Sequence, residues 1–321
     1  MTASVLLTRR LPDEAMAFLE ERTDLTVNPE DRPIRRDELL DGVRGRQGVI
    51  PMLTDRIDDE VLVAAGPGLR VVSNYAVGYD NVDVGACTRH GVAVTNTPDV
   101  LTAATADIAW ALILGAARRV VEGDRLARAG TPWSWAPTFM LGREVTGATL
   151  GVIGFGRIGQ AVAARGRAFD MDVRYASRTP RPDVALGATH RPLDALLAEA
   201  DVISVHVPLS DDTRHLFGDH AFRVMKPTAV FVNTSRGPVV DEAALARALR
   251  DGEIFAAGLD VYEREPEVHP DLLRLQNVVL APHLGSATVE TRTAMGMLAA
   301  RNLLDVIEER RPAALLNPEA L

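Results

Sequence analysis

The segment that decides the fold is TLGVIGFGRIGQAVAARGRAF, residues Thr149–Phe169. Its apolar beginning, TLGVIG, predicts a strand, and its end, QAVAARGRAF, is compatible with a helix. The pattern G-x-G-x-x-G lies between them, and in this context it binds a dinucleotide. Gly154 allows a tight turn, Gly156 lets the backbone approach a pyrophosphate, and Gly159 permits close packing of helix on strand. Because a helix N-terminus favours phosphate, we predict a nucleotide site here rather than a glycine-rich turn without a ligand.

Short apolar runs follow this strand at regular intervals. They are Asp172–Ala176, Val202–Val207, Ala229–Asn233, Ala257–Asp260 and Val278–Ala281. Together with Thr149–Gly154 they form a series of six predicted strands, separated by segments long enough for helices. This alternation is typical of a doubly wound parallel sheet.

An earlier series of apolar runs predicts a second parallel sheet. Its strands are expected at Ser4–Thr8, Gly48–Ile50, Arg70–Asn74 and Ala93–Thr95, with helices between them, the first at Glu14–Glu21.

Two helices are expected to connect the two sheets. The first is a single long helix over Leu101–Val121, with Pro98 as a hinge before it, because proline restricts the chain ahead of a helix. The second, Val289–Arg310, has no strand after it and can return to the first sheet. The prediction is therefore α/β, with two doubly wound parallel-sheet domains of Rossmann or flavodoxin type. Residues 1–98 and 288–321 form a discontinuous substrate-binding domain and residues 99–287 an NAD(P)-binding domain, with the active-site cleft between them.

Composition excludes several classes of protein. The length of 321 residues suits two domains. The net charge of −9 argues against binding to nucleic acid or to an anionic membrane. Cys87 is the only cysteine, so neither an internal disulfide nor a thiolate metal cluster is expected, and we predict no metal site. The most apolar stretch, Val100–Ala117, contains Asp107 and is shorter than a membrane span. The apolar run near the N-terminus is too short for a signal peptide, so a cytoplasmic location is expected.

The end of the second nucleotide-domain strand bears on the choice of cofactor. An Asp or Glu about 20 residues after the glycine turn would bind the ribose 2′-hydroxyl of NAD. This chain instead continues from Ala176 with Ser177, Arg178 and Thr179, and no acidic residue stands between Asp172 and Asp183. These three side chains can donate hydrogen bonds to a 2′-phosphate, which predicts a preference for NADP with NAD still possible. The alternative is a solvated basic turn that tolerates both.

Three residues that could carry chemistry follow strands of the same series. Arg236 comes after the strand that ends at Asn233, Glu265 lies in YEREPE, and His283 follows Ala281-Pro282. Ligands of doubly wound sheets bind beyond the carboxyl ends of the strands. Each residue alone has an ordinary interpretation, as a surface ion pair, a loop carboxylate or a structural histidine. Their common placement indicates a reaction on an anionic carbonyl acid.

Several long motifs resemble those of the D-isomer-specific 2-hydroxyacid dehydrogenases, and most closely the glyoxylate/hydroxypyruvate reductases. The motifs cover nearly the whole chain: SNYAVGYDNVD (Ser73–Asp83), VTNTPDVLTAATADIA (Val94–Ala109), LGVIGFGRIG (Leu150–Gly159), VNTSRGPVVDE (Val232–Glu242), GLDVYEREP (Gly258–Pro266) and PHLGSAT (Pro282–Thr288).

The resemblance implies an oxidoreductase that reduces glyoxylate or hydroxypyruvate to glycolate or D-glycerate, by hydride transfer from NADPH or NADH. It makes Arg236, Glu265 and His283 the catalytic residues. Arg236 would bind and polarise the 2-oxo acid, His283 would donate the proton, and Glu265 would hold the imidazole.

The resemblance also implies binding residues and a partner. Val77 and Gly78 would bind the substrate carboxylate through backbone N–H groups, Leu53 would cover the substrate, and Trp135 would reach the active site of the other subunit of a homodimer. The cofactor would be held by Thr105, Gly154, Phe155, Gly156, Arg157, Ile158, Gly159, Ser177, Arg178, Thr179, His206, Val207, Pro208, Thr213, Thr234, Ser235, Arg236, Asp260, His283 and Gly285.

Two departures from related branches narrow the activity, and two alternatives stay open. Ala176 stands where the glycerate and phosphoglycerate branches generally carry Asp, and Pro282 precedes His283 whereas formate dehydrogenases pair their histidine with Gln. The first alternative is another D-2-hydroxyacid dehydrogenase, acting on phosphoglycerate, phosphite or a bulkier 2-oxo acid. The second is a dinucleotide-sensing binding protein similar to the corepressors that share this fold.

Overall fold

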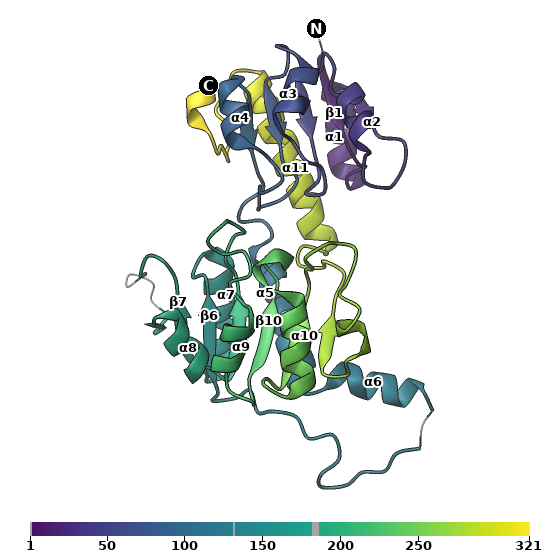
Figure 1. The fold of residues 1–321 in the computed structure, drawn as a ribbon. Coiled ribbons are helices and arrows are strands. Elements are labelled where there is room, and N and C mark those ends of the chain that lie inside the picture. The colour runs from purple at the N-terminus through teal and green to yellow at the C-terminus, as the bar shows by residue number, and fades with distance from the viewer. Residues whose placement is uncertain (1, 131, 182–185) are drawn as a thin grey trace. The chain divides into compact units, whose positions relative to one another are not determined.

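The computed structural model describes residues 2–130, 132–181 and 186–321, so Asp183 lies outside the described residues. The chain divides into two compact units, residues up to 101 with 287–321, and residues 102–286. The boundaries predicted from the sequence lie at 98/99 and 287/288. Each unit is a parallel α/β layer structure (Figure 1).

The first unit contains a five-stranded sheet in the order β2-β1-β3-β4-β5, which is the flavodoxin-like order. Its strands are β1 (Ala3–Leu7), β2 (Thr23–Val27), β3 (Gly48–Ile50), β4 (Val71–Ser73) and β5 (Ala93–Thr95). Its helices are α1 (Asp13–Arg22), α2 (Arg36–Gly42), α3 (Asp59–Ala65), α4 (Val84–Arg89) and α11 (Val289–Ile307), followed by the short 3₁₀ turn Pro318–Ala320.

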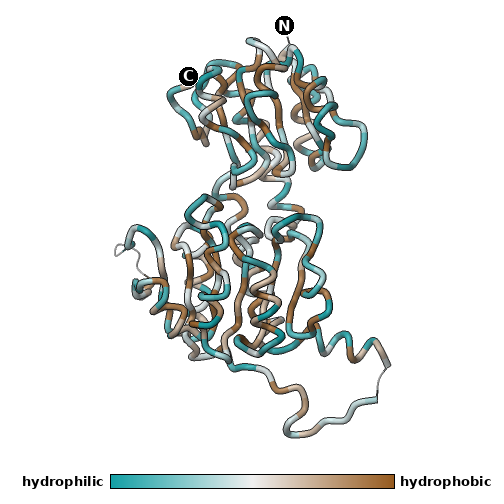
Figure 2. Tube along the Cα trace, in the orientation of Figure 1, coloured by the Kyte–Doolittle hydropathy of each residue, from teal (hydrophilic) through white to brown (hydrophobic). Residues whose placement is uncertain are grey.

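Alternation along the strands explains why helices cover both faces of this sheet. Leu6 joins the apolar core under α2, α3 and α4, whereas Val5 and Leu7 join the core under α1 and α11. Successive side chains of a strand point to opposite faces, so an all-apolar strand needs a cover on each side. Figure 2 shows apolar residues running along the strands of this unit and hydrophilic residues on the outside.

The second unit contains a seven-stranded sheet in the order β12-β11-β10-β9-β6-β7-β8, the Rossmann order with one strand added. Its strands are β6 (Thr149–Ile153), β7 (Asp172–Ala176), β8 (Thr189–His190), β9 (Val202–Val205), β10 (Val230–Asn233), β11 (Ala256–Leu259) and β12 (Val278–Leu280). Its helices are α5 (Thr102–Ala117), α6 (Val120–Arg128), α7 (Arg157–Ala168), α8 (Leu193–Glu199), α9 (Asp219–Val224) and α10 (Glu242–Asp251), with 3₁₀ turns at Gly237–Val239 and Leu272–Arg274.

Two apolar cores cover the faces of this larger sheet. Helices α5 and α7 pack on one face, and α8, α9 and α10 pack on the other. The chain changes direction of winding between β6 and β9, which pair directly. Ligands of doubly wound sheets bind at this switch point, outside the carboxyl ends of the strands.

The fold class predicted from sequence is confirmed, with three corrections. Strands β2 and β8 were not predicted, because β2 is only partly buried beyond its first residue and β8 has only two residues. The helix predicted over Leu101–Val121 is two helices, since Arg119 adopts a left-handed φ of 55° between α5 and α6.

Within the described ranges, no helix is both long and apolar enough to cross a membrane.

Candidate active site

The turn after β6 can be built only with glycine at two positions. Gly154 has a φ of +90°, and a Cβ there would lie 2.7 Å from the backbone carbonyl of His206 on the neighbouring strand end. A Cβ on Gly159 would lie 2.2 Å from the carbonyl oxygen of Gly154. Helix α7 therefore begins close against β6, with its first N–H groups at the edge of the sheet.

Space for a ligand opens over the middle glycine of this turn. A Cβ built on Gly156 meets no atom within 4 Å among the described residues, so the backbone is accessible from that side. The hydroxyl of Thr234, after β10, is buried and has no hydrogen-bond partner within the described part of the chain. Buried polar groups are normally paired. An open glycine turn at a helix N-terminus and an orphaned hydroxyl both fit a bound dinucleotide.

Residues after β9 line the same edge. The Nε2 of His206 is 2.8 Å from the hydroxyl of Ser204, and burial of the imidazole lowers the pKa of His206 to about 3. The ring is therefore neutral at physiological pH. Thr213 ties down the loop that follows, because its hydroxyl donates to the carbonyl of Pro208 and accepts from the N–H of Ser210.

At the end of β7, the predicted 2′-phosphate residues lie in an exposed turn. Tyr175 is buried and stacks on Phe155 of the glycine turn, with ring centroids 4.0 Å apart. The hydroxyl of Ser177 donates to the carbonyl of Thr179 at 2.7 Å, so its proton is already engaged. This local bond was not predicted from sequence, and it engages one of the three donors that were predicted for a 2′-phosphate.

The structure brings Glu265 and His283 into direct contact. The Nδ1 of His283 is 2.8 Å from a carboxylate oxygen of Glu265, and each side chain is 29% exposed. His283 follows β12 with a left-handed φ of 55°. Its backbone N–H donates to the carbonyl of Asp260 at the end of β11. Because Nδ1 faces the carboxylate, Nε2 is the nitrogen that remains for a reacting group.

The loop that carries His283 is fixed by the buried carboxylate of Asp260. The N–H groups of Leu284 and Gly285 donate to it at 2.6 and 2.8 Å, and burial raises the pKa of Asp260 despite these two bonds. Thr105, at the start of α5, donates its hydroxyl to the carbonyl of Gly285.

Glu265 is held in its ionised form by its neighbours. Burial by itself raises the pKa of Glu265, but the hydrogen bond and charge of His283, the N–H of Tyr262 and the charge of Arg236 together bring it below the usual value. Arg236 follows β10, where its guanidinium donates to the carbonyl of Ser235 and its own carbonyl accepts from Asn233. A guanidinium, a carboxylate and an imidazole thus converge at one sheet edge, a set that can bind an anion and move a proton.

The predicted substrate residues of the first unit lie in two loops joined by hydrogen bonds. The carbonyls of Val77 and Gly78 accept from the side chains of Asn96 and Asn74. The amide of Asn81 donates to the carbonyls of Met52 and Asp55, on either side of Leu53.

Asn81 is not among the site residues predicted from the sequence, although it stands within the motif GYDNVD. Its partners are 26 and 29 residues away along the chain, so only the fold reveals that it ties the two loops together.

Trp135, the residue predicted to reach the partner subunit, lies in the second unit and is 80% exposed.

Comparison with known proteins gives consistent matches. The family described as D-isomer specific 2-hydroxyacid dehydrogenase, NAD binding domain, matches residues 110–285. A protein of Thermococcus onnurineus described as glyoxylate reductase is 48% identical, over 100% of this chain and 98% of that protein. A crystal structure from Thermus thermophilus superposes with a TM-score of 0.91 at 46% identity, covering 98% of this chain and 99% of that one. An NADPH-dependent glyoxylate/hydroxypyruvate reductase from Sinorhizobium meliloti, in complex with NADP and malonate, gives 0.86 at 32% identity, covering 100% and 98%.

Proposed function

The chain belongs to the D-isomer specific 2-hydroxyacid dehydrogenases, and from this premise we propose that it reduces glyoxylate and hydroxypyruvate to glycolate and D-glycerate, preferentially with NADPH. The contact of 2.8 Å between His283 and Glu265, with the charge of Arg236 acting on the same carboxylate, carries the proposal. The relatives named glyoxylate reductase support this choice of substrate.

The cofactor is a nicotinamide dinucleotide, and the residues at the sheet edge fit it. The turn Gly154–Gly159 would bind the pyrophosphate, the segment 206–208 and Thr234 would line the nucleotide, and Arg178 would bind a 2′-phosphate. When bound, the reduced nicotinamide supplies the hydride that the carbonyl carbon of the substrate receives.

The protein's own part in the reaction is to bind the acid and deliver a proton. Arg236 is always protonated and can bind the carboxylate and the carbonyl oxygen of a 2-oxo acid in a fork. Nε2 of His283 donates its proton to the carbonyl oxygen as that oxygen becomes negative, and the ionised Glu265 stabilises the imidazolium until then. We assign the substrate carboxylate also to the backbone N–H groups of Val77 and Gly78, and the cover of the substrate to Leu53.

A panel of substrates tests the activity, with the rate of each reaction measured by the absorbance of the reduced nicotinamide. Glyoxylate and hydroxypyruvate should give the highest kcat/KM, above bulkier 2-oxo acids and, in the oxidative direction, above phosphoglycerate and phosphite. The variant His283→Ala should lose a factor of about 10²–10⁴ in turnover, the range of general acid catalysis, while it still binds NADPH. A protein that binds NADPH but turns over none of these acids would be a binding module, and the proposal would be wrong.

The proposed preference for NADPH rests on the absence of an acidic residue between Asp172 and Asp183 in the sequence and on the guanidinium of Arg178. A net difference of about 1.4 kcal/mol gives tenfold selectivity, and we expect at least that factor in kcat/KM. Arg178→Ala should reduce the preference and leave NADH use nearly unchanged, whereas Ala176→Asp should reverse it. Arg181→Ala, which removes an equal charge three residues further on, is the matched control. Equal or better kcat/KM with NADH in the unchanged protein would refute the preference alone.

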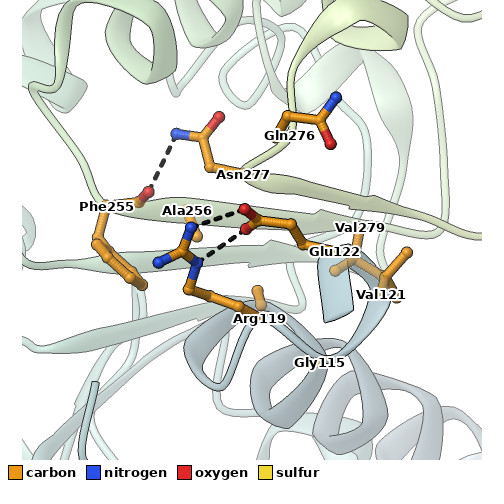
Figure 3. A pocket seen from close by; sticks show the side chains of 10 residues that line it. Gly115, Arg119, Val121, Glu122, Phe255, Ala256, Gln276, Asn277 and Val279 are labelled. Atoms are coloured by element: carbon orange, nitrogen blue, oxygen red, sulfur yellow. Dashed lines mark hydrogen bonds and ion pairs between the residues drawn. The ribbon is translucent and has the colours of Figure 1, made fainter. Parts of the chain in front are cut away.

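We further propose that the protein is a cytoplasmic homodimer in which a second copy covers helix α6. None of the residues of α6 is buried, and Val120, Trp133 and Leu141 are each about 60% exposed. Beside this helix lies a hollow of about 270 Å³, where Arg119 and Glu122 form an ion pair of 2.7 Å (Figure 3). Exposed apolar side chains that gather in one surface region mark candidate interaction sites.

Sedimentation of the purified protein tests the assembly, and a stable, fully active monomer would contradict it. If Trp135 reaches the partner's active site, Trp135→Ala should lower kcat/KM for glyoxylate more than Trp133→Ala. Trp133 is the appropriate control because its ring stacks on Phe139 of the same chain.

A further inference from the structure

Glu242, the first residue of α10, is a carboxylate that the proposed chemistry leaves unused. It is only 5% exposed, although Glu is rarely buried unless its charge is satisfied. Burial raises the pKa of Glu242, while two backbone N–H donors partly offset that effect. A buried acid with specific donors is either structural or functional, and its partners decide between the two.

The partners of Glu242 stand at the two ends of the loop that carries Glu265. One carboxylate oxygen accepts from the N–H of Glu263 at 2.8 Å, and the other accepts from the N–H of His269 at 3.1 Å. The contact with Glu263 is reciprocal, because the N–H of Glu242 donates to the carboxylate of Glu263 at 2.9 Å. One side chain therefore bridges the base of the segment 263–269, and Glu265 lies inside that segment.

A second contact joins the same loop to the segment that follows Arg236. A Cβ built on Gly237 would lie 1.8 Å from the carbonyl of Tyr262, so the two backbones touch at this point and only glycine fits. The N–H of Tyr262 in turn donates to Glu265 at 3.1 Å. Gly237 and Glu242 thus hold the loop of Glu265 at two places, through a backbone contact and through the carboxylate of Glu242.

From this geometry we infer that Glu242 is a positioning residue. It holds Glu265 at hydrogen-bonding distance from His283 and fixes the position of Glu265 relative to Arg236. The inference rests on the proposed function. Arg236 and Glu265 come from separate loops, so their relative position depends on contacts between those loops. Side chains that orient a proton-transferring group must hold it within a fraction of an ångström, and their loss lowers turnover without removing a contact to substrate.

The variant Glu242→Gln tests this role. The amide can accept from only one of the two N–H groups, and its own NH₂ would face the other donor. We expect kcat to fall by up to about tenfold, the effect of one lost hydrogen bond, with KM for NADPH unchanged and the alkaline limb of the pH profile moved to lower pH. Asp241→Ala is the matched control, because Asp241 caps the same helix through the N–H of Ala244. That variant should lower the melting temperature and leave kcat and the pH profile as they are.

A double-mutant cycle separates positioning from general stability. If Glu242 acts through Glu265, the effect of Glu242→Gln on kcat should disappear in the Glu265→Gln background. Equal effects in both backgrounds, or an unchanged pH profile in a folded Glu242→Gln protein, would overturn the inference. Should Glu242→Gln fail to fold, Glu242→Asp keeps the charge and shortens the reach, and the same cycle applies.

Nitrogen NMR of the histidine ring provides a readout that does not require turnover. The Nδ1 signal of His283, assigned with His283→Gln, should show a hydrogen-bonded proton in the unchanged protein and a weakened bond in Glu242→Gln. Asp241→Ala should leave this signal unchanged. If no 2-oxo acid is reduced but the signal responds as expected, the proposed function fails and the positioning role stands. An unaffected signal in Glu242→Gln removes the positioning role, whatever the substrate.

Discussion

Replacing Glu265 by Gln tests whether its charge, rather than its shape, supports proton transfer by His283. In the native protein the ionised carboxylate accepts from Nδ1 of His283 at 2.8 Å and from the N–H of Tyr262 at 3.1 Å. Gln has nearly the same size and can keep the bond to Tyr262 through its carbonyl oxygen. Its NH₂ group then faces Nδ1, which must accept rather than donate. The imidazolium that the reaction needs is therefore disfavoured.

The expected magnitude follows from the kind of bond that is lost. A hydrogen bond to a charged group contributes about 1.5–3 kcal/mol, and the exposure of 29% for both side chains favours the lower end of that range. Since about 1.4 kcal/mol corresponds to tenfold, kcat/KM at neutral pH should fall roughly tenfold to thirtyfold. Because the imidazolium is disfavoured, the alkaline limb of the pH profile should move to lower pH.

The acid limb of the pH profile reflects protonation of Glu265. Because the pKa of Glu265 is lowered in the folded protein, its carboxylate stays charged below the usual range of Glu, and its contribution is lost only as the pH falls further. Steady-state rates with glyoxylate between pH 4 and 10 measure both limbs. Glu267→Gln, which removes an exposed charge from the same loop, is the control. Superimposable profiles for Glu265→Gln and the unchanged protein would refute the charge-based mechanism.

Further predictions concern Arg236, two glycines of the turn after β6, and His206. Arg236→Lys should raise KM for glyoxylate as well as lower kcat, because an ammonium cannot form the two-pronged contact; steady-state constants that match the native ones would exclude direct substrate binding. Gly156→Ala should have the melting temperature of the native protein but bind NADPH more weakly, since its Cβ would point into the open space over the turn. Gly159→Ala should lower the free energy of unfolding by about 1–3 kcal/mol, because its Cβ meets a carbonyl oxygen. The folded-state pKa of His206 lies below its ordinary 6.5, so between about pH 3 and 6.5 the unfolded chain binds a proton that the folded chain does not. The free energy of unfolding should therefore rise with pH there, by at most about 1.4 kcal/mol per unit, and denaturant titrations should show a flatter rise for His206→Gln.

The sequence by itself determined the features whose physical cause is local. Gly154 and Gly159 are needed because a Cβ would collide with the backbone a few residues away or on the adjacent strand end, and such needs leave a readable pattern. Six strands of the larger sheet and four of the smaller were predicted from short apolar runs, because buried parallel strands are apolar on both faces. The positions of Arg236, Glu265 and His283 after strands could likewise be read directly, since each stands next to a run that is itself recognisable.

Only the tertiary structure decided what depends on residues far apart in the chain. The edge strands β2 and β8 owe their conformation to pairing with β1 and β7, so their own composition carries little signal. The left-handed Arg119 interrupts an apolar segment that reads as one helix. Glu242 looks like an ordinary residue of a helical first turn, and its role emerges only from its bonds to residues 21 and 27 positions away. Burial and long-range hydrogen bonds form when the fold closes, so no local pattern records them.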